Sequence, residues 1–206
     1  MSKHFALAIG CGTQNRDDQW LEVFYPNPLL NPDDALVDSI AEDVDYQGGN
    51  LAVELNHRQI GKIAREWREA GFEHEASYAI AMQESQRPVV LVILQSDDSP
   101  KTTPEAYLKL HLLSHRLVKP HGLNLTGIFG LLPNVAWTND GAVDLDELPE
   151  RQLMARLDGR VLSVFSVDKF PRMTDYVVPA GVRIADTARV RLGAYIGEGT
   201  TIMHEG

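Results

Sequence analysis

The sequence predicts an α/β N-terminal domain followed by the first turn of a left-handed parallel β-helix. The β-helix is predicted by a period of six. Over the last thirty residues an aliphatic residue stands at every sixth position, namely at Val178, Ile184, Val190, Ile196 and Ile202. Helices repeat every 3.6 residues and strands every 2, whereas short fixed periods of this kind are typical of repeat architectures. The α/β prediction comes from the earlier residues, which alternate between strand-like and helix-like segments.

The six-residue repeats predict a coil whose interior is aliphatic. Three repeats close one triangular turn, and each aliphatic residue points into a stack that the next turn covers. Small or modest residues stand four places after each aliphatic one, as tight corners require: Val182, Ala188, Ala194 and Thr200. The chain reaches Gly206 little more than one turn into the repeat. We therefore expect residues from Ile196 onward to be disordered unless another copy packs on them.

Composition predicts a cytoplasmic protein that binds neither nucleic acid nor membranes. The chain has 206 residues, 44% of them hydrophobic and 23% charged. Its formal net charge of −10 argues against a nucleic-acid binder, which needs clustered Lys and Arg. The single Cys11 forms no internal disulfide, and a small buried residue on a strand is a better interpretation of it than a catalytic thiol. The first residues lack the apolar core of a signal peptide, and no apolar run reaches membrane-spanning length.

Three segments in the first hundred residues predict the sheet. Residues 5–9 and 20–25 are rich in strand formers and predict a β-hairpin, with residues 10–13 as a glycine-containing turn. Residues 89–94 form a short, continuous aliphatic run, which predicts a central strand covered on both faces.

Helix signals are distinct between and after these strands. Asp33 and Asp34 open a short helix, and Asn56 caps a longer one that Gly71 ends. A second long helix is expected over residues 73–83. Thr103, followed by proline, begins a helix that runs to residue 118. His111 and His115 lie one turn apart on it and could share a metal, but a polar face of the helix is the favoured interpretation.

The chain divides into three predicted parts. Residues 1–122 form the N-terminal α/β domain. Residues 123–176 form a linking segment with strands at 135–138 and 161–167 and a short helix at 148–157. Residues 177–206 begin the hexapeptide-repeat β-helix. No internal repeat precedes residue 177.

The sequence contains no nucleophile elbow, phosphate-binding loop or zinc motif. The polar residues of the repeat point away from the coil and can contact a ligand or a neighbour. The dipeptide His204-Glu205 combines a titratable base with a hard carboxylate. The other polar repeat residues are interpreted as a solvated rim: Arg183, Asp186, Arg189, Arg191 and Glu198.

Long runs of the sequence resemble tetrahydrodipicolinate N-succinyltransferase in its actinobacterial and pseudomonad form. They are TPEAYLKLHLLSHRLVKPH (103–121), LPNVAWTN (132–139), FSVDKFPRMTDYVVP (165–179), GVRIAD (181–186) and TTIMHEG (200–206). The resemblance spans nearly the whole chain and is loosest between residues 34 and 88. It implies a cytoplasmic homotrimeric acyltransferase of lysine and diaminopimelate biosynthesis. Such an enzyme moves a succinyl group from succinyl-CoA to the amine of ring-opened tetrahydrodipicolinate.

The resemblance also implies where the site residues lie. The family's catalytic glutamate belongs to a Val-Glu-Gly-Arg-like motif that follows the His-Glu-Gly run, so no catalytic residue is expected within residues 1–206. The 206-residue chain is then the N-terminal portion of the enzyme, truncated early in the repeat and inactive alone. The residues that bind CoA stay unassigned. Glu205 matches a family glutamate that binds magnesium near the trimer axis, whereas Ala188 stands where some members have its partner aspartate.

Two other classes of function are compatible with the sequence. The chain could be a non-catalytic α/β module that serves oligomerisation and carries a vestigial repeat. It could also be a hexapeptide-repeat carbonic anhydrase, which needs several histidine ligands for zinc. Since His204 is the one histidine in the repeat, the carbonic anhydrase is the weakest of the three.

Overall fold

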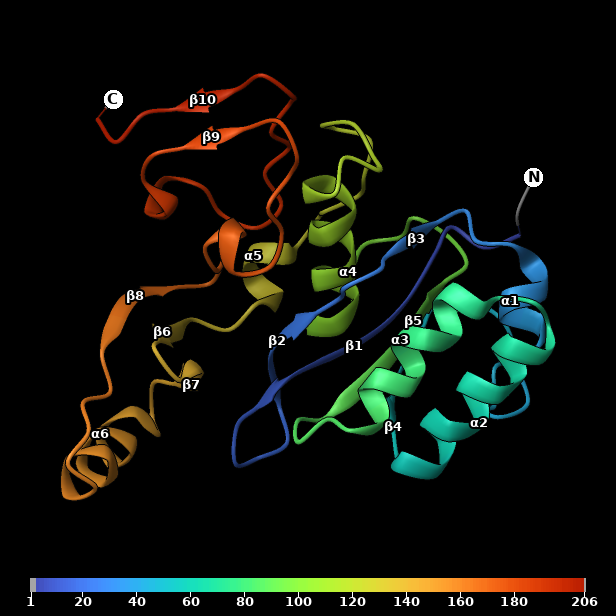
Figure 1. Cartoon of the computed structure of the whole chain (residues 1–206), viewed down its shortest axis with the longest axis horizontal. Helices are drawn as coiled ribbons and strands as arrows, with labels where there is room; N and C mark the ends of the chain where they lie inside the picture. Colours follow the sequence, from blue (N-terminus) through green and yellow to red (C-terminus); the bar gives the residue numbers. More distant parts are fainter. Residues whose placement is uncertain (1–2, 206) are drawn as a thin grey trace.

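The computed structural model describes residues 3–205, and its N-terminal half is built on a five-stranded antiparallel sheet (Figure 1). The strand order is β2-β1-β5-β4, and the short β3 also pairs with β1. The predicted hairpin is present as the antiparallel pair β1–β2. The strands are β1 (Ala6–Gln14), β2 (Trp20–Phe24), β3 (Leu29–Leu30), β4 (Leu51–Leu55) and β5 (Val89–Leu94). β4 lies at the edge next to β5 and has no counterpart in the sequence prediction.

The predicted burial of β5 on both faces is confirmed. Every residue of β5 is buried, and alternate side chains enter two different hydrophobic cores. Val90, Val92 and Leu94 pack with the helix α4 (Thr103–Ser114), while Val89, Leu91 and Ile93 pack with the helices of the opposite face. Because neighbouring side chains of a strand point to opposite sides, one aliphatic run supplies both cores.

Three helices cover the face of the sheet opposite α4: α1 (Asp34–Asp38), α2 (His57–Glu69) and α3 (Glu73–Gln83). Asn56 caps α2 as predicted, because its side chain accepts from the Gln59 amide while the Gln59 side chain accepts from the Asn56 amide. Gly71 follows α2 with a φ of +90°, as expected for a helix-ending glycine. None of the described helices is long and apolar enough to cross a bilayer.

Helix α4 is shorter and more buried than the sequence prediction. It ends at Ser114 rather than at residue 118, and its N-cap is Thr102 rather than Thr103. All twelve of its residues are buried, so the expected polar face is absent. The sheet covers one side of α4, and the linking segment and the repeat cover the others, which explains why amphipathicity was a poor guide to it.

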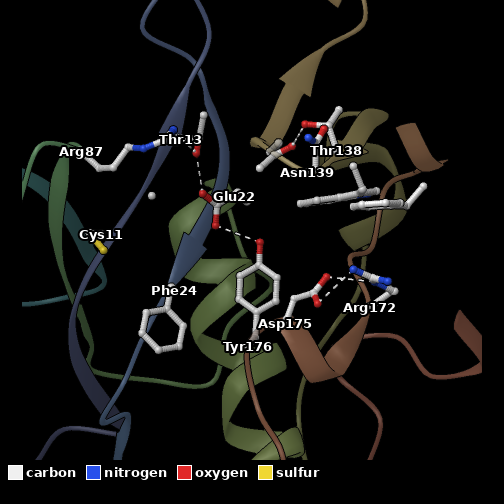
Figure 2. Close-up of a pocket in the computed structure, with 15 residues that line it drawn as sticks. Cys11, Thr13, Glu22, Phe24, Arg87, Thr138, Asn139, Arg172, Asp175 and Tyr176 are labelled. Atoms are coloured by element: carbon white, nitrogen blue, oxygen red, sulfur yellow. Dashed lines mark hydrogen bonds and ion pairs between the residues drawn. The ribbon is translucent and has the colours of Figure 1, made fainter. Parts of the chain in front are cut away.

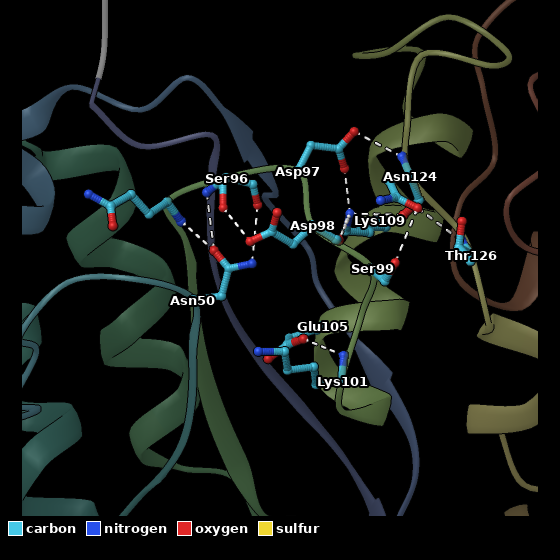
Figure 3. Close-up of polar contacts among 11 residues, drawn as sticks. Asn50, Ser96, Asp97, Asp98, Ser99, Lys101, Glu105, Lys109, Asn124 and Thr126 are labelled. Atoms are coloured by element: carbon cyan, nitrogen blue, oxygen red, sulfur yellow. Dashed lines mark hydrogen bonds and ion pairs between the residues drawn. The ribbon is translucent and has the colours of Figure 1, made fainter.

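A buried lysine fastens α4 to the loop that precedes it (Figure 3). The Lys109 side chain has no solvent exposure, and its ammonium group donates to Asp97 Oδ1, to the Asp98 carbonyl at 2.6 Å and to the Asn124 carbonyl at 3.0 Å. Asp97 Oδ2 in turn accepts from the Asn124 amide at 2.8 Å. This cluster joins the end of β5, α4 and the start of the linking segment.

The linking segment carries the predicted strands and helix in a second, smaller sheet. β6 (Val135–Thr138) lies between β7 (Gly141–Asp144) and β8 (Val164–Asp168), and both pairings are antiparallel. Helix α6 (Leu148–Leu157) connects β7 to β8 with the bounds that the sequence predicted. The short helix α5 (Ile128–Leu131) precedes β6.

The C-terminal residues wind back on themselves after two short 3₁₀ turns, η1 (Met173–Asp175) and η2 (Thr187–Arg189). Strands β9 (Arg183–Ile184) and β10 (Thr201–Ile202) pair in parallel, with Ile184 opposite Ile202. These partners are eighteen positions apart (202 − 184), which is the length of three six-residue repeats. For residues 196–205 the expected disorder is not found, since β10 is paired and the Ala185 amide donates to the Ile202 carbonyl at 2.9 Å; Gly206 lies outside the described residues.

The aliphatic positions of the repeat are buried unequally. Val190 is 4% exposed, and Ile184, Ile196 and Ile202 are half-buried. Val178 is 71% exposed, so the expectation that it points into the coil was wrong. The preceding Val177 is buried instead, because successive side chains of an extended segment point to opposite sides.

The C-terminal end of α4 holds the repeat in place. Ser114 Oγ accepts from the Gly193 amide at 2.9 Å and donates to the Ala194 carbonyl at 3.1 Å. Arg116 donates from Nε to the Ile196 carbonyl at 2.6 Å and from Nη2 to the Ala180 carbonyl at 2.9 Å. The first coil is therefore bonded directly to the helix that crosses the large sheet.

Candidate functional site

A cavity of about 460 Å³ lies between the two sheets (Figure 2). Residues of β1 and β2 form one wall, and residues of β6, β7, β8 and the segment around η1 form the other. Its volume is within the range of small-molecule pockets. Its walls combine aromatic rings with four charged side chains: Glu22, Arg87, Arg172 and Asp175.

Glu22 is the buried carboxylate of this cavity. Its side chain projects from β2 and is 9% exposed. Oε1 accepts from the Thr13 hydroxyl at 2.7 Å and Oε2 accepts from the Tyr176 hydroxyl at 2.9 Å, as Figure 2 shows. Burial raises the pKa of Glu22 above its usual value, although the hydrogen bonds from Thr13 and Tyr176 act in the opposite direction. The carboxyl group is thus held by two hydroxyl donors and by no ion-pair partner within the described residues.

Two glycines of β1 allow β2 to approach this closely. The sequence suggested a turn at residues 10–13, but these residues belong to β1. A Cβ atom on Gly12 would lie 2.1 Å from the Glu22 carbonyl oxygen, and one on Gly10 would lie 2.5 Å from the Phe24 carbonyl oxygen. Glycine is needed here for close backbone approach rather than for a turn.

The two arginines of the cavity differ in their partners. Arg172 donates to both oxygens of Asp175, at 3.0 and 3.2 Å, and its guanidinium carbon lies 5.0 Å from the centre of the Phe165 ring. Arg87 donates from Nη1 to the Thr13 hydroxyl at 3.1 Å. Arg87 is exposed at the cavity and belongs to none of the ion pairs found in residues 3–205.

Behind Tyr176 lie the rings of His111, which is fully buried on α4, and of His115, which is half-buried just after the end of that helix. The His111 ring centre is 5.7 Å from that of Tyr176 and 6.2 Å from that of His115. His111 Nδ1 donates to the Tyr107 carbonyl at 2.7 Å, because its Nε2 accepts from the Tyr25 amide at 3.2 Å. The sequence had suggested that both imidazoles lie on a polar face of the helix. Instead, the His111 ring is buried in the interior, and the His115 ring stacks on it.

Burial sets the protonation of these histidines. It lowers the pKa of His111 to about 3, against the opposing effect of the hydrogen bond to Tyr107, and it also lowers the pKa of His115. The His111–His115 pair has no acidic or cysteine neighbour that would complete a metal site, since the described residues contain no group of three or more potential ligands. The pair is neutral and structural.

The sequence-predicted site residues of the repeat lie apart from the cavity. Glu205 is exposed, and its nearest charged partner is His204, with Nε2 3.6 Å from Oε1. A single chain thus presents one carboxylate of the kind that magnesium prefers, but not a complete set of ligands. Cys11 lies on β1 as predicted and is half-buried in the cavity wall, where burial raises the pKa of its thiol.

The residues that build the cavity were missed by sequence reasoning. Glu22 offered one signal, since it is a lone charge between apolar residues in the strand-forming run at 20–25. Tyr176 and Arg172 fell within a quoted run of the resemblance, but their role there was unassigned. Tyr176 and Glu22 are 154 positions apart, so no local pattern could have joined them.

The fold and the cavity define the class of this protein. It is an α/β protein in which a domain with an antiparallel sheet is joined, through a small three-stranded sheet, to a C-terminal coil. In this coil the chain pairs in parallel with itself after eighteen positions. Two family models match parts of the chain. The model described as "Tetrahydrodipicolinate N-succinyltransferase N-terminal" matches residues 51–130, and the one described as "Tetrahydrodipicolinate N-succinyltransferase middle" matches residues 132–172. The chain belongs to the tetrahydrodipicolinate N-succinyltransferase family.

Similar proteins extend the match to almost the whole chain. A 2,3,4,5-tetrahydropyridine-2,6-dicarboxylate N-succinyltransferase of Pseudomonas paraeruginosa is 64% identical over 203 residues, and one of Vibrio cholerae is 56% identical over 203 residues. Each alignment covers 98% of this chain but only 58% and 59% of the relative, so the chain spans a little over half the length of these proteins.

A solved structure from Campylobacter jejuni shares the fold. That protein carries a provisional description as a 2,3,4,5-tetrahydropyridine-2-carboxylate N-succinyltransferase. It superposes with a TM-score of 0.86 at 24% identity, over 99% of this chain and 57% of the other.

Proposed function

We propose that the whole protein transfers the succinyl group of succinyl-CoA to the amine of ring-opened tetrahydrodipicolinate, in lysine and diaminopimelate biosynthesis in the cytoplasm. The observation that carries this proposal is the 64% identity to a named N-succinyltransferase, which runs through 98% of this chain. At that identity the sheet domain, the linking segment and the start of the repeat are all matched together. The proposal is thus stronger than one that rests on a common fold.

The parts of the chain have different roles in this proposal. Residues 1–122 are the N-terminal domain, residues 123–176 link it to the repeat, and residues 177–206 begin a left-handed hexapeptide-repeat β-helix. The eighteen-residue offset between β9 and β10 supports the last assignment. A second cavity of about 630 Å³ supports it as well, because apolar residues of the repeat line it, among them Val190, Leu192, Ile196 and Ile202. In a β-helix such a surface is where the next coil packs.

The chemistry requires parts that we assign to no residue of this chain. The amine nitrogen attacks the thioester carbonyl, so that a C–N bond forms and the C–S bond breaks. A general base takes the proton from nitrogen, hydrogen-bond donors stabilise the oxyanion, and CoA leaves as the thiol after gaining a proton. A rigid groove between β-helices of a homotrimer suits this reaction, because it aligns amine and thioester.

Release of CoA thiol tests the function. We fuse residues 1–206 to the part of the P. paraeruginosa relative that the chain does not cover, and we follow thiol release with a chromogenic thiol reagent. The fusion is expected to release CoA only when both succinyl-CoA and tetrahydrodipicolinate are present, whereas residues 1–206 alone are expected to release none. A folded fusion without turnover would contradict the proposed function. Turnover by residues 1–206 alone would place the catalytic residues inside this chain.

Magnesium binding tests the role of Glu205. We propose that three copies of Glu205 meet at the trimer axis and bind one magnesium ion, since one copy offers a single exposed carboxylate. Calorimetric titration of the trimeric fusion with magnesium chloride is expected to show binding that Glu205→Gln abolishes. Glu198→Gln, which removes another exposed carboxylate of the repeat, is the matched control and is expected to bind as the parent does. Equal binding by Glu205→Gln and the parent would refute the assignment.

A further inference from the structure

The cavity between the two sheets contains one cation, Arg87, that forms no direct ion pair with a described residue. Arg87 extends from the residues that precede β5 toward Thr13, as Figure 2 shows, and uses Nη1 to donate to that hydroxyl. Its Nη2 lies 3.9 Å from the position that a Cβ on Gly141 would occupy, so the guanidinium reaches from one sheet to the other. Nη2 and Nε have no hydrogen-bond acceptor among the described residues. Two nitrogen atoms of a rigid fork are therefore available as donors at the cavity.

The other charges of the cavity are already satisfied. Asp175 holds Arg172 through two hydrogen bonds. Both oxygens of Glu22 accept from hydroxyl groups, and burial shifts that carboxyl group toward its neutral form. Arg87 acts electrostatically on Glu22 and lowers the pKa of that carboxyl group, against the effect of burial, but it forms no ion pair with Glu22 or with any other described residue. A guanidinium fork of this kind pairs best with a carboxylate, through two parallel hydrogen bonds.

The walls of the cavity favour a flat apolar body on the ligand. Phe24 and Phe165 keep 36% and 54% of their surface exposed although both line the cavity. The indole of Trp137 and the ring of Tyr176 complete the aromatic surface, and Trp137 is fixed because its Nε1 donates to the Asp168 carbonyl at 2.9 Å. Aromatic rings offer a planar ligand stacked or edge-on contacts.

We propose that this cavity binds a small organic carboxylate with a planar apolar body, with the carboxylate on Arg87 and the body among the rings of Phe24, Trp137 and Phe165. This binding site is separate from the acyl transfer proposed above, because no residue of this chain is given a catalytic role in that reaction. It stands or falls independently of that function, because the test below measures binding to residues 1–206 and needs neither CoA nor turnover.

Nuclear magnetic resonance of the 206-residue chain tests the proposal with benzoate as the probe. Benzamide serves as the uncharged probe of the same shape. Benzoate is expected to shift the Trp137 indole N–H signal, assigned through Trp137→Phe, in a saturable manner, and benzamide is expected to bind at least about tenfold more weakly. Indole-3-acetate and indole-3-acetamide form a second matched pair of larger size. If neither carboxylate gives a saturable shift, the proposal is overturned.

Arginine variants locate the carboxylate. Arg87→Gln is expected to weaken benzoate binding by about tenfold or more, because it removes the charged fork and leaves the aromatic walls intact. Arg151→Gln removes an exposed guanidinium from α6, outside the cavity, and is expected to bind benzoate as the parent does. Equal affinity in Arg87→Gln and the parent, or an equal loss in both variants, would overturn the proposal, since binding would then not depend on Arg87.

Discussion

Replacing Asp97 by alanine is expected to lower the free energy of unfolding by about 3–5 kcal/mol. Lys109 is fully buried, and Asp97 is the carboxylate that neutralises it (Figure 3). Without Asp97 the ammonium group keeps the carbonyls of Asp98 and Asn124, at 2.6 and 3.0 Å, and the face of the Phe5 ring, whose centre is 6.0 Å away, but no carboxylate. A buried charge left without its counter-ion is costly, because the interior replaces the lost hydration poorly. The variant also loses the bond from the Asn124 amide to Asp97.

Urea unfolding followed by circular dichroism measures this effect. Asp158→Ala is the matched control, because Asp158 pairs with Arg160 at 3.3 Å but both side chains are more than half exposed. Its loss is expected to stay below about 0.5 kcal/mol. Lys109→Met is the informative companion, since it removes the buried charge instead of isolating it and leaves Asp97 within reach of water at 29% exposure. If Asp97→Ala costs no more than Lys109→Met or the control, the Lys109–Asp97 pair is not the anchor we infer.

Local signals predicted the elements that are defined by their own residues. The aliphatic run at 89–94 fixed a central strand, and the cap at Asn56 and the glycine at Gly71 fixed both ends of α2. β4 was missed because its sequence, LAVEL, is short and contains alanine and glutamate, which are depleted in strands. What makes it a strand is its partner β5, which lies almost forty positions later. Pairing of this kind is invisible in a local window.

Burial of α4 shows a second limit of sequence reasoning. A helix in the middle of a fold is apolar in all directions, and its few polar residues then look like an exposed face. His111 was interpreted in this way, yet it is fully buried and hydrogen-bonded, as is its neighbour on the helix, Lys109. Their partners come from segments up to 86 positions away, as with the Tyr25 amide that donates to His111. The sequence therefore could not separate a buried polar network from a solvated surface.

The candidate cavity was unpredictable for a related reason. Its buried carboxylate lies on β2, its hydroxyl donors on β1 and next to η1, and its free guanidinium just before β5. Each of these residue types is common on a surface, and only the packing of two sheets makes them a site. The parallel return of β10 to β9 after eighteen positions, by contrast, agrees with the predicted period of six, because that signal extends over adjacent residues.

Acidification is expected to destabilise this protein through His111. The folded pKa of about 3 is lower than the ordinary 6.5, so the neutral imidazole is favoured by folding. This contribution is fully present above pH 6.5 and is lost as the pH falls toward 3, because the unfolded chain then binds a proton that the folded chain does not. Each unit by which the pH falls within this window lowers the free energy of unfolding by up to about 1.4 kcal/mol. The total loss between pH 6.5 and pH 4.5 is then about 2–3 kcal/mol.

The slope of stability against pH isolates this residue. Urea unfolding is measured at pH 7, 6, 5 and 4.5 for the parent and for His111→Gln, whose side chain can also donate and accept but does not titrate. The variant is expected to be less stable at pH 7 and to show a slope smaller by about one proton between pH 6 and pH 4.5. Two other groups affect the slope in the parent and in the variant alike: His115, whose pKa is also lowered, steepens it, and Glu22, whose pKa is raised, flattens it. The difference in slope between the two proteins therefore comes from His111. His57→Gln, which removes an exposed imidazole at the start of α2, is measured alongside as the control for the substitution of a histidine by glutamine. An unchanged slope in His111→Gln would show that His111 gains its proton in the folded chain as easily as in water, and that burial does not hold it neutral.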